Sequence, residues 1–307
     1  MFMLRLQSGG LLIIPNEKNC LFYTIAGITI CFETEWKEEV NNDFKPFLGN
    51  NGENEYLVSF QMVEKLREYS GEYIYKNLGF SVFPDIDFEY VRRFHDSLNN
   101  ERPYAITKMN LKERKIIVEY LADSCRFFCN SRNDFFHIGW EKMLLNEDRI
   151  ILHAACVNSS LGGILFSGPS GIGKSTQAEL WCKYVNSRLL NGDRVILHKD
   201  CKSRRWNAYG SPYAGSSKCH LNEWCPVRAV VMLKKAQKCS IRRLDTREAF
   251  CRVFAQLTIN SWDKGFVLKA SDWVLKLVDD IPVYELACTP DERSVNLLME
   301  ELYGRNA

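Results

Sequence analysis

The sequence predicts an α/β fold in which a β-rich N-terminal domain precedes a domain with a mixed sheet. Residues 163–184 have the pattern of a buried strand, a glycine loop and a helix. A second strand, predicted over residues 149–157, turns back into the strand before the loop as an antiparallel hairpin would. Strand-like runs also dominate the sequence up to about residue 130. We therefore predict two domains, residues 1–132 and 133–307.

Three segments rich in β-branched, aromatic and apolar residues predict strands in the N-terminal domain: 21–32, 55–63 and 116–120. Gly27 lies in the middle of the first segment and predicts a hairpin turn or a bulge there. This half of the chain shows no catalytic constellation of residues. We expect it to recognise a substrate or to serve as an accessory domain.

The predicted boundary between the domains lies just before a helix over residues 135–145. Apolar side chains repeat on one face of this segment, which is typical of an amphipathic helix. Asp134 precedes it and is expected to cap its first turn.

Beyond the glycine loop, the C-terminal domain continues with alternating strands and helices. Strands are predicted at residues 206–210 and 229–233. One helix is expected to open at residues 245–248, and a capping box at residues 289–292 opens the last helix.

The glycine loop GPSGIGKST, residues 168–176, satisfies the pattern G-x-x-x-x-G-K-[ST] in full. Its glycines allow positive φ, so successive N–H groups can point at phosphates at the start of the helix. Lys174 is expected to reach the β- and γ-phosphates, and the Ser175 hydroxyl to bind Mg²⁺. The alternative is a turn that merely joins strand to helix, which the complete motif in this context disfavours. The expected ATP- and Mg²⁺-binding residues are Gly168, Ser170, Gly171, Ile172, Gly173, Lys174, Ser175 and Thr176.

Three further residues are candidates for the chemistry of phosphoryl transfer. Asp193 lies between two apolar runs and could bind Mg²⁺ together with Ser175, or accept the acceptor's proton. A strand-end aspartate that caps a turn is the alternative. His153 lies in the strand beside the loop and could orient the acceptor, or be a hydrogen-bonded core residue. Arg194 could pair with phosphate or with Asp193, or be a plain surface arginine.

Composition excludes several classes of protein. A formal net charge of +2 and the lack of a long basic run give no indication of a nucleic-acid partner. No signal peptide or membrane-spanning run is visible, so we expect a cytoplasmic location, reduced thiols and no membrane partner.

The 12 cysteines contain no C-x-x-C. A zinc site at Cys219, His220 and Cys225 is the alternative. Homo-oligomerisation is left open.

Three segments together resemble the catalytic domain of HPr kinase/phosphorylase, a group related to ATP-dependent phosphoenolpyruvate carboxykinase. They are the pair His153-Ala154, the loop GPSGIGKST and the run RLLNGDRV at residues 188–195. The resemblance covers residues 150–197 well. It implies a mixed-sheet P-loop kinase domain of that type, with a serine-directed kinase activity. The residues that match the family's pattern are His153, Lys174, Ser175 and Asp193.

The chain departs from this family at the acid pair, where Gly192 replaces the first acid. The reverse, phosphorylase reaction is therefore in doubt, and a Gly192→Asp substitution would restore the pair. Thr176 also stands where HPr kinases often have an acid.

The full-length layout, including YGSPY at residues 209–213, looks like the HPr-kinase-related proteins of peptide-modification clusters, which include lasso-peptide kinases. We therefore expect a hydroxyl of a peptide or protein, such as a ribosomal peptide precursor, to be the phosphoryl acceptor. A small-molecule hydroxyl kinase and a non-catalytic ATP-binding regulatory or assembly module are the alternatives.

Overall fold

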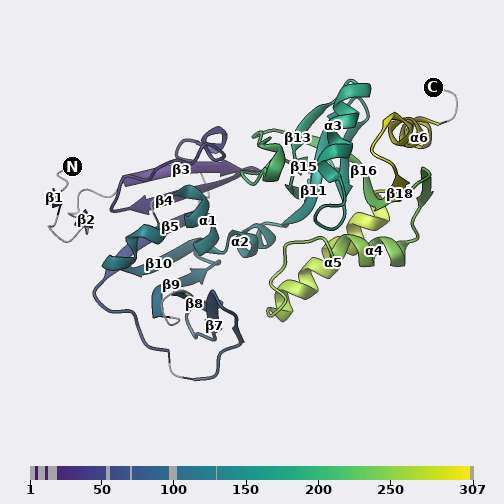
Figure 1. The fold of residues 1–307 in the computed structure, drawn as a ribbon. Coiled ribbons are helices and arrows are strands. Elements are labelled where there is room, and N and C mark those ends of the chain that lie inside the picture. Colours follow the sequence, from purple (N-terminus) through teal and green to yellow (C-terminus); the bar gives the residue numbers. More distant parts are fainter. Residues whose placement is uncertain are drawn as a thin grey trace. The chain divides into compact units, whose positions relative to one another are not determined.

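The chain divides into two compact units, Met1–Trp140 and Glu141–Ala307 (Figure 1). The computed structural model describes residues 4–5, 11–12, 19–52, 56–69, 71–96, 102–128 and 130–304.

The described part of the N-terminal unit is built on one eight-stranded sheet in the order β3-β4-β5-β10-β9-β8-β7-β6. Pairing is parallel at β4–β5 and β5–β10 and antiparallel elsewhere along it. The strands are β3 (Asn19–Ile25), β4 (Ile28–Thr34), β5 (Tyr56–Val63), β6 (Tyr75–Lys76), β7 (Phe80–Phe83), β8 (Val91–Asp96), β9 (Arg102–Asn110) and β10 (Lys115–Leu121). The other elements are β1 (Leu4–Arg5), β2 (Leu11–Leu12) and the 3₁₀ helices η1 (Lys45–Phe47) and η2 (Ala122–Phe127).

The first predicted strand segment is a β-hairpin, with its turn at the expected glycine. Strands β3 and β4 pair antiparallel around Ala26 (φ 50°) and Gly27 (φ 77°). A two-residue turn with positive φ at both positions matches the right-handed twist of the strands it joins. The other two predicted segments correspond to β5 and β10.

The single helix predicted over residues 135–145 is wrong. The structure has two short helices, α1 (Ser131–Ile138) and α2 (Trp140–Asn146), separated by Gly139 in the left-handed region (φ 66°). The N-cap residue of α1 is Asn130, whose side chain accepts a hydrogen bond from the Arg132 amide (3.1 Å). Asp134 is therefore not a cap and lies inside α1, fully buried.

Aromatic packing explains why α1 belongs to the N-terminal unit. The Phe135 ring is fully buried, and its centroid lies 5.3 Å from that of Tyr23 and 4.9 Å from those of Phe32 and Phe44. Burial of this ring against the sheet attaches the helix to the strands before it. The division of the chain accordingly falls after Trp140, eight residues beyond the predicted boundary.

The C-terminal unit contains a mixed sheet, as the sequence predicts. Its described strands follow the order β12-β11-β14-β15-β16-β18-β17, and β13 pairs with β11 off this path. Strand β12 also pairs with β16. The five strands β12, β11, β14, β15 and β16 therefore form a closed ring of paired strands. The strands are β11 (Arg149–Ser159), β12 (Gly162–Ser167), β13 (Arg188–Asn191), β14 (Arg194–Lys199), β15 (Trp206–Tyr209), β16 (Trp224–Lys235), β17 (Ser240–Arg243) and β18 (Val283–Cys288).

Helices cover both faces of this sheet (Figure 1). Helices α3 (Lys174–Tyr184) and α6 (Glu292–Tyr303) pack on one face, and the Ser294 hydroxyl of α6 donates a hydrogen bond to Gln177 of α3 (3.1 Å). Helices α4 (Thr246–Phe254) and α5 (Lys264–Asp280) pack on the other. The 3₁₀ helix η3 spans Gly215–Ser217. Across the described ranges, no helix combines the length and apolar character that a membrane crossing needs.

We predict that Phe135→Ala destabilises the N-terminal unit by about 3–5 kcal/mol, because it leaves a cavity among buried rings. Its neighbour Phe136 is 57% exposed, so Phe136→Ala should cost far less. Urea unfolding monitored by circular dichroism measures both variants. Equal unfolding midpoints for the two would contradict the assignment of α1 to this unit.

Candidate active site

The phosphate loop begins where β12 ends. All six residues of β12 are buried, and the strand is held between β11, which is antiparallel to it, and β16, which is parallel to it. Gly168 (φ 143°), Gly171 (φ 73°) and Gly173 (φ 112°) take the positive φ values that the motif requires. A Cβ atom at Gly171 or Gly173 would meet no heavy atom within 4 Å. The loop therefore leaves open space at these positions for a ligand to approach the backbone.

Lys174 bends back over this loop from the first turn of α3. Its Nζ donates hydrogen bonds to the carbonyl oxygens of Gly168 (3.1 Å) and Pro169 (3.3 Å). The residue is only 7% exposed, and burial lowers the pKa of its amine. A cation in this position can exchange its carbonyl partners for phosphate oxygens, so the loop fits the triphosphate of a nucleotide.

The remaining residues predicted to bind nucleotide surround Lys174. Ser170 and Gly171 are exposed on the loop, and Ser175 and Thr176 follow Lys174 in the first turn of α3. The Ile172 amide already donates a hydrogen bond to the Pro169 carbonyl (3.3 Å). Since Ser175 offers a hydroxyl next to Lys174, it fits the Mg²⁺ ligand that the motif implies.

A buried asparagine shapes the turn that carries the candidate acid. Asn191 is fully buried at the end of β13. Its Oδ1 accepts hydrogen bonds from the amides of Asp193 and Arg194, both at 2.9 Å, and its Nδ2 donates to the Ser211 carbonyl (2.9 Å). We name residues 191–194 the acid turn. Three hydrogen bonds from one buried side chain fix the backbone from which Asp193 projects.

Asp193 and His153 contact each other in this unit. His153 Nε2 lies 3.1 Å from Asp193 Oδ1, and both side chains are 29% exposed. Strand register explains the contact, since His153 is paired with Arg194 across β11 and β14. The Ala154 amide also donates to the Asp193 carbonyl (2.9 Å), which fixes the acid turn to β11.

Electrostatics keep Asp193 ionised. The hydrogen bond with His153 lowers the pKa of the Asp193 carboxyl most, and attraction from Arg194, from His153 and from Lys174 lowers it further, against the effect of burial. Lys174 belongs to the phosphate loop, so its attraction for Asp193 is an electrostatic interaction between this loop and the acid turn. An ionised carboxylate beside a phosphate loop can bind Mg²⁺ or stabilise a positive charge on the histidine.

Arg194 divides its interactions between Asp193 and a neighbouring segment. Its Nε lies 3.9 Å from Asp193 Oδ2, and its Nη1 donates a hydrogen bond to the Thr258 hydroxyl (2.6 Å). The segment around Thr258 lies against β11, since the Thr258 amide donates to the Ile151 carbonyl (3.0 Å). Arg194 is therefore held beside the acid by a residue distant in sequence.

Residues 211–218, which we name the capping loop, pack closely against the acid turn. A Cβ atom at position 192 would lie 1.8 Å from Ser217 Oγ and 2.4 Å from Ser217 Cβ. A Cβ atom at Gly215 (φ 59°) would lie 2.8 Å from the Cβ of Asp193. The Gly192→Asp change that would restore the family's acid pair therefore does not fit the structure without movement of this loop. Gly192 is required by close packing.

Sequence patterns alone missed Asn191, Thr258 and Ser217. An asparagine directly before Gly-Asp is a turn signal that could have indicated the first. The other two lie too far along the chain from the acid turn for a local pattern to show them.

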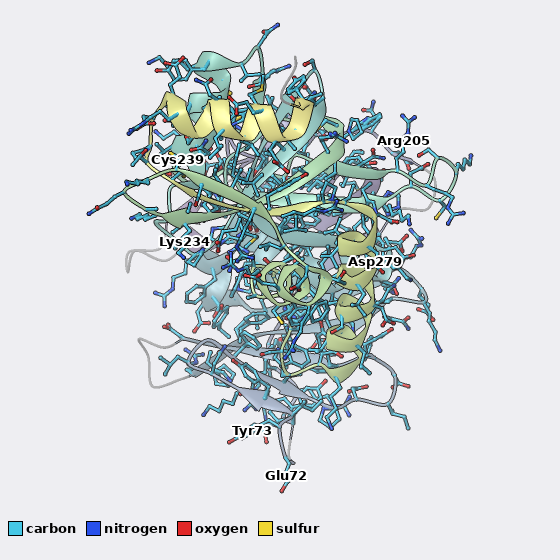
Figure 2. The ribbon with its side chains drawn as sticks, turned by 90° about the vertical axis from the view of Figure 1, so that its right-hand side faces the viewer. Glu72, Tyr73, Arg205, Lys234, Cys239 and Asp279 are labelled. Carbon is cyan, nitrogen blue, oxygen red and sulfur yellow. The ribbon has the colours of Figure 1, made fainter. Side chains whose placement is uncertain are left out.

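The cysteines considered for zinc, and a basic residue near the acid turn in sequence, have other surroundings. Arg205 projects from the surface in the connection between β14 and β15 (Figure 2). Cys219 Sγ donates a hydrogen bond to the Leu189 carbonyl (3.1 Å), and Cys225 Sγ lies 3.9 Å from the Sγ of Cys156. In the parts of the chain that the structure describes, no group of three or more His, Cys, Asp or Glu side chains could hold a metal ion.

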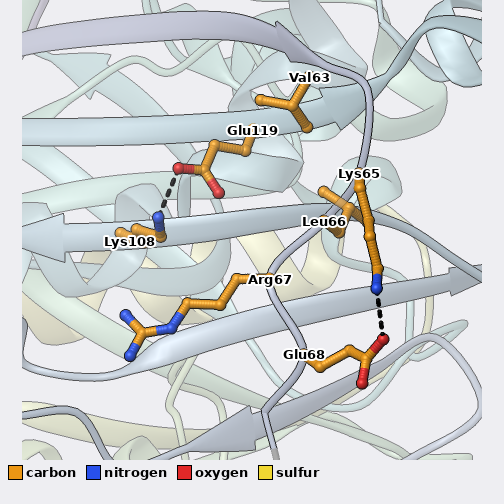
Figure 3. Close-up of a pocket in the computed structure, with 7 residues that line it drawn as sticks. All are labelled: Val63, Lys65, Leu66, Arg67, Glu68, Lys108 and Glu119. Atoms are coloured by element: carbon orange, nitrogen blue, oxygen red, sulfur yellow. Dashed lines mark hydrogen bonds and ion pairs between the residues drawn. The ribbon is translucent and has the colours of Figure 1, made fainter.

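An open hollow in the N-terminal unit is lined by Val63, Lys65, Leu66, Arg67, Glu68, Lys108 and Glu119 (Figure 3). Its charges are largely neutralised by two ion pairs, Lys108–Glu119 and Lys65–Glu68, the second at 2.9 Å. The phosphate loop and acid turn lie in the other unit.

No protein-family model and no curated protein matches the chain. Among solved structures it is similar to the Hpr(Ser) kinase/phosphatase from Coxiella burnetii, at 14% sequence identity. The match covers 50% of this chain and 88% of that one, with a TM-score of 0.29. At that TM-score the two structures do not superpose closely.

We predict that Gly192→Asp destabilises the C-terminal unit by about 1–3 kcal/mol, because the new side chain overlaps Ser217. The double variant Gly192→Asp/Ser217→Gly should recover part of this loss, and Ser217→Gly alone is the control. Thermal unfolding measures all three. A Gly192→Asp protein as stable as the parent would show that the capping loop does not pack against position 192.

Proposed function

We propose that this chain is an ATP- and Mg²⁺-dependent kinase that transfers the γ-phosphoryl group to a hydroxyl of a peptide or protein. The observation that carries the proposal is the contact between His153 and Asp193 (3.1 Å) beside the phosphate loop of the same unit. A loop that only bound nucleotide would need no such pair.

Two groups of residues would hold the nucleotide and its metal. The amides of residues 168–176 and the Lys174 amine would bind the phosphates, and Ser175 and Asp193 would bind Mg²⁺. When bound, Mg²⁺ neutralises charge on the β- and γ-phosphates. The low pKa of Asp193 suits this role, because a carboxylate must be ionised to bind the metal.

The same pair would receive the proton that the acceptor hydroxyl releases. The bond from the γ-phosphorus to the bridging oxygen of ADP breaks as the acceptor oxygen bonds to that phosphorus. The lowered pKa makes Asp193 a weak base by itself. We therefore assign the proton to the His153–Asp193 pair, in which the carboxylate stabilises the protonated imidazole. Arg194, held by Thr258, would stabilise negative charge on the transferred group.

Support for a peptide or protein acceptor comes from the resemblance in sequence layout and from the separate N-terminal unit, to which we assign substrate recognition. Transfer to a small-molecule hydroxyl uses the same residues and is the alternative. Incubation with labelled ATP and cell extract, followed by separation of peptides from small molecules, distinguishes the two.

We predict that Lys174→Ala abolishes phosphoryl transfer and leaves the fold intact. The substitution removes the amine that faces the phosphates, so transfer is lost. Among the described residues, the Lys174 side chain donates hydrogen bonds only to two loop carbonyls, so the fold does not depend on it. Nucleotide titration and labelled-ATP transfer measure the loss, with circular dichroism as the control for folding. Transfer at the parent rate would show that the phosphate loop takes no part in phosphoryl transfer.

We predict that Asp193→Asn lowers transfer by at least about 10²–10⁴-fold, since it removes both the metal ligand and the partner of His153. Nucleotide affinity should fall much less, because the loop amides and Lys174 remain. His153→Ala should show a smaller loss than Asp193→Asn.

Asp279→Asn is the matched control, because Asp279 is exposed on α5 (Figure 2). If Asp193→Asn instead keeps the activity of that control, the protein is better described as a non-catalytic ATP-binding module.

A further inference from the structure

Two acidic side chains and two hydroxyl groups lie together in the N-terminal unit, where α1 packs on the sheet. We name Tyr23, Glu38, Ser131 and Asp134 the acidic cluster. Tyr23, Ser131 and Asp134 are fully buried, and Glu38 follows β4. None of these residues takes part in the proposed kinase chemistry.

Hydrogen bonds hold most of the acidic cluster in place. The Tyr23 hydroxyl donates to Glu38 Oε1 (2.6 Å), and the Ser131 hydroxyl oxygen accepts from the Asn41 amide (3.0 Å). Ser131 and Asp134 are three residues apart in α1, so their side chains lie on the same helix face. The helix and the segment after β4 thus bring these oxygen atoms into one region.

Three carboxylate oxygens of the acidic cluster are buried without a partner in the described part of the chain. They are Oδ1 and Oδ2 of Asp134 and Oε2 of Glu38. Buried polar atoms are nearly always hydrogen-bonded or bound to an ion, because each unpaired one costs free energy. An aspartate with both oxygens unpaired is therefore unusual and indicates a missing partner.

The charge of the acidic cluster also lacks compensation. Burial raises the pKa of Glu38 to about 7, and burial together with the charge of Glu38 raises the pKa of Asp134 well above its usual value. Among the described residues, no lysine, arginine or histidine contributes to either shift. A fully buried carboxylate beside a half-buried one, without a cation, is strongly unfavourable.

A bound proton would compensate only part of the charge of Asp134 and Glu38 and would pair only some of their oxygens. A proton shared between Asp134 and Glu38 would remove one negative charge, but the other charge and at least one Asp134 oxygen would still lack a partner. A divalent cation would balance both negative charges and would take the unpaired oxygens as ligands. Carboxylate and hydroxyl oxygens are the ligands that Mg²⁺ and Ca²⁺ prefer in proteins.

We propose that Asp134 and Glu38 form a binding site for a hard divalent cation, Ca²⁺ or Mg²⁺, with the Ser131 hydroxyl on the same face of α1 as Asp134. This site stabilises the attachment of α1 to the sheet of the N-terminal unit. It is independent of the proposed kinase activity, which uses residues of the other unit.

Thermal unfolding and calorimetric titration of the nucleotide-free, full-length chain test this proposal. After removal of metal with EDTA, addition of CaCl₂ or MgCl₂ at constant ionic strength should raise the Tm by several degrees at about 100 times the Kd. The two salts, used separately, show which cation binds. Omission of nucleotide keeps Mg²⁺ from entering the phosphate site as its ATP complex.

Asp134→Asn should weaken cation binding at least about 10-fold, and should have a higher Tm than the parent in EDTA, because it removes an uncompensated charge. Glu38→Gln serves as the second variant if Asp134→Asn does not fold. Glu113→Gln, at an exposed position of the same unit, is the control. A parent Tm unaffected by either cation would overturn the proposal in favour of a protonated pair. Undiminished binding in both cluster variants would overturn it as well.

Discussion

The double pairing of β11 determines how the candidate active site is assembled. On one side its Ala154 is paired with Ser167, the last residue before the phosphate loop, and on the other its His153 is paired with Arg194. A shift of one residue in either register would turn His153 to the opposite face of the sheet. Because both pairings are fixed, one strand holds the phosphate loop and the acid turn side by side.

Close packing around the acid turn explains why position 192 is a glycine. Asn191 fixes the backbone of this turn from within, and the capping loop occupies the space that a side chain at position 192 would need. The acid turn therefore carries one carboxylate, that of Asp193. Its chemistry depends on the position of Asp193 against His153, and the lowered pKa of Asp193 is a consequence of that contact.

Local patterns in the sequence indicated the parts of the structure that neighbouring residues determine. The phosphate loop, the hairpin turn at Gly27 and the strand that carries His153 are of this kind. The helix at the domain boundary was wrongly predicted because Asn130 and Asp134 are both suitable caps, and burial of Phe135 against distant strands decides between them. The need for Gly192 likewise depends on Ser217, which no local pattern relates to it.

A crystal structure with Mg²⁺ and a non-hydrolysable ATP analogue tests the central claim most directly. The account predicts that Lys174 leaves the carbonyls of the loop to bind the β- and γ-phosphates. It also predicts that Mg²⁺ contacts Ser175 and Asp193, with the γ-phosphate facing His153. A γ-phosphate directed away from the acid turn, with Asp193 and His153 in contact with neither metal nor phosphate, would contradict the proposed kinase site.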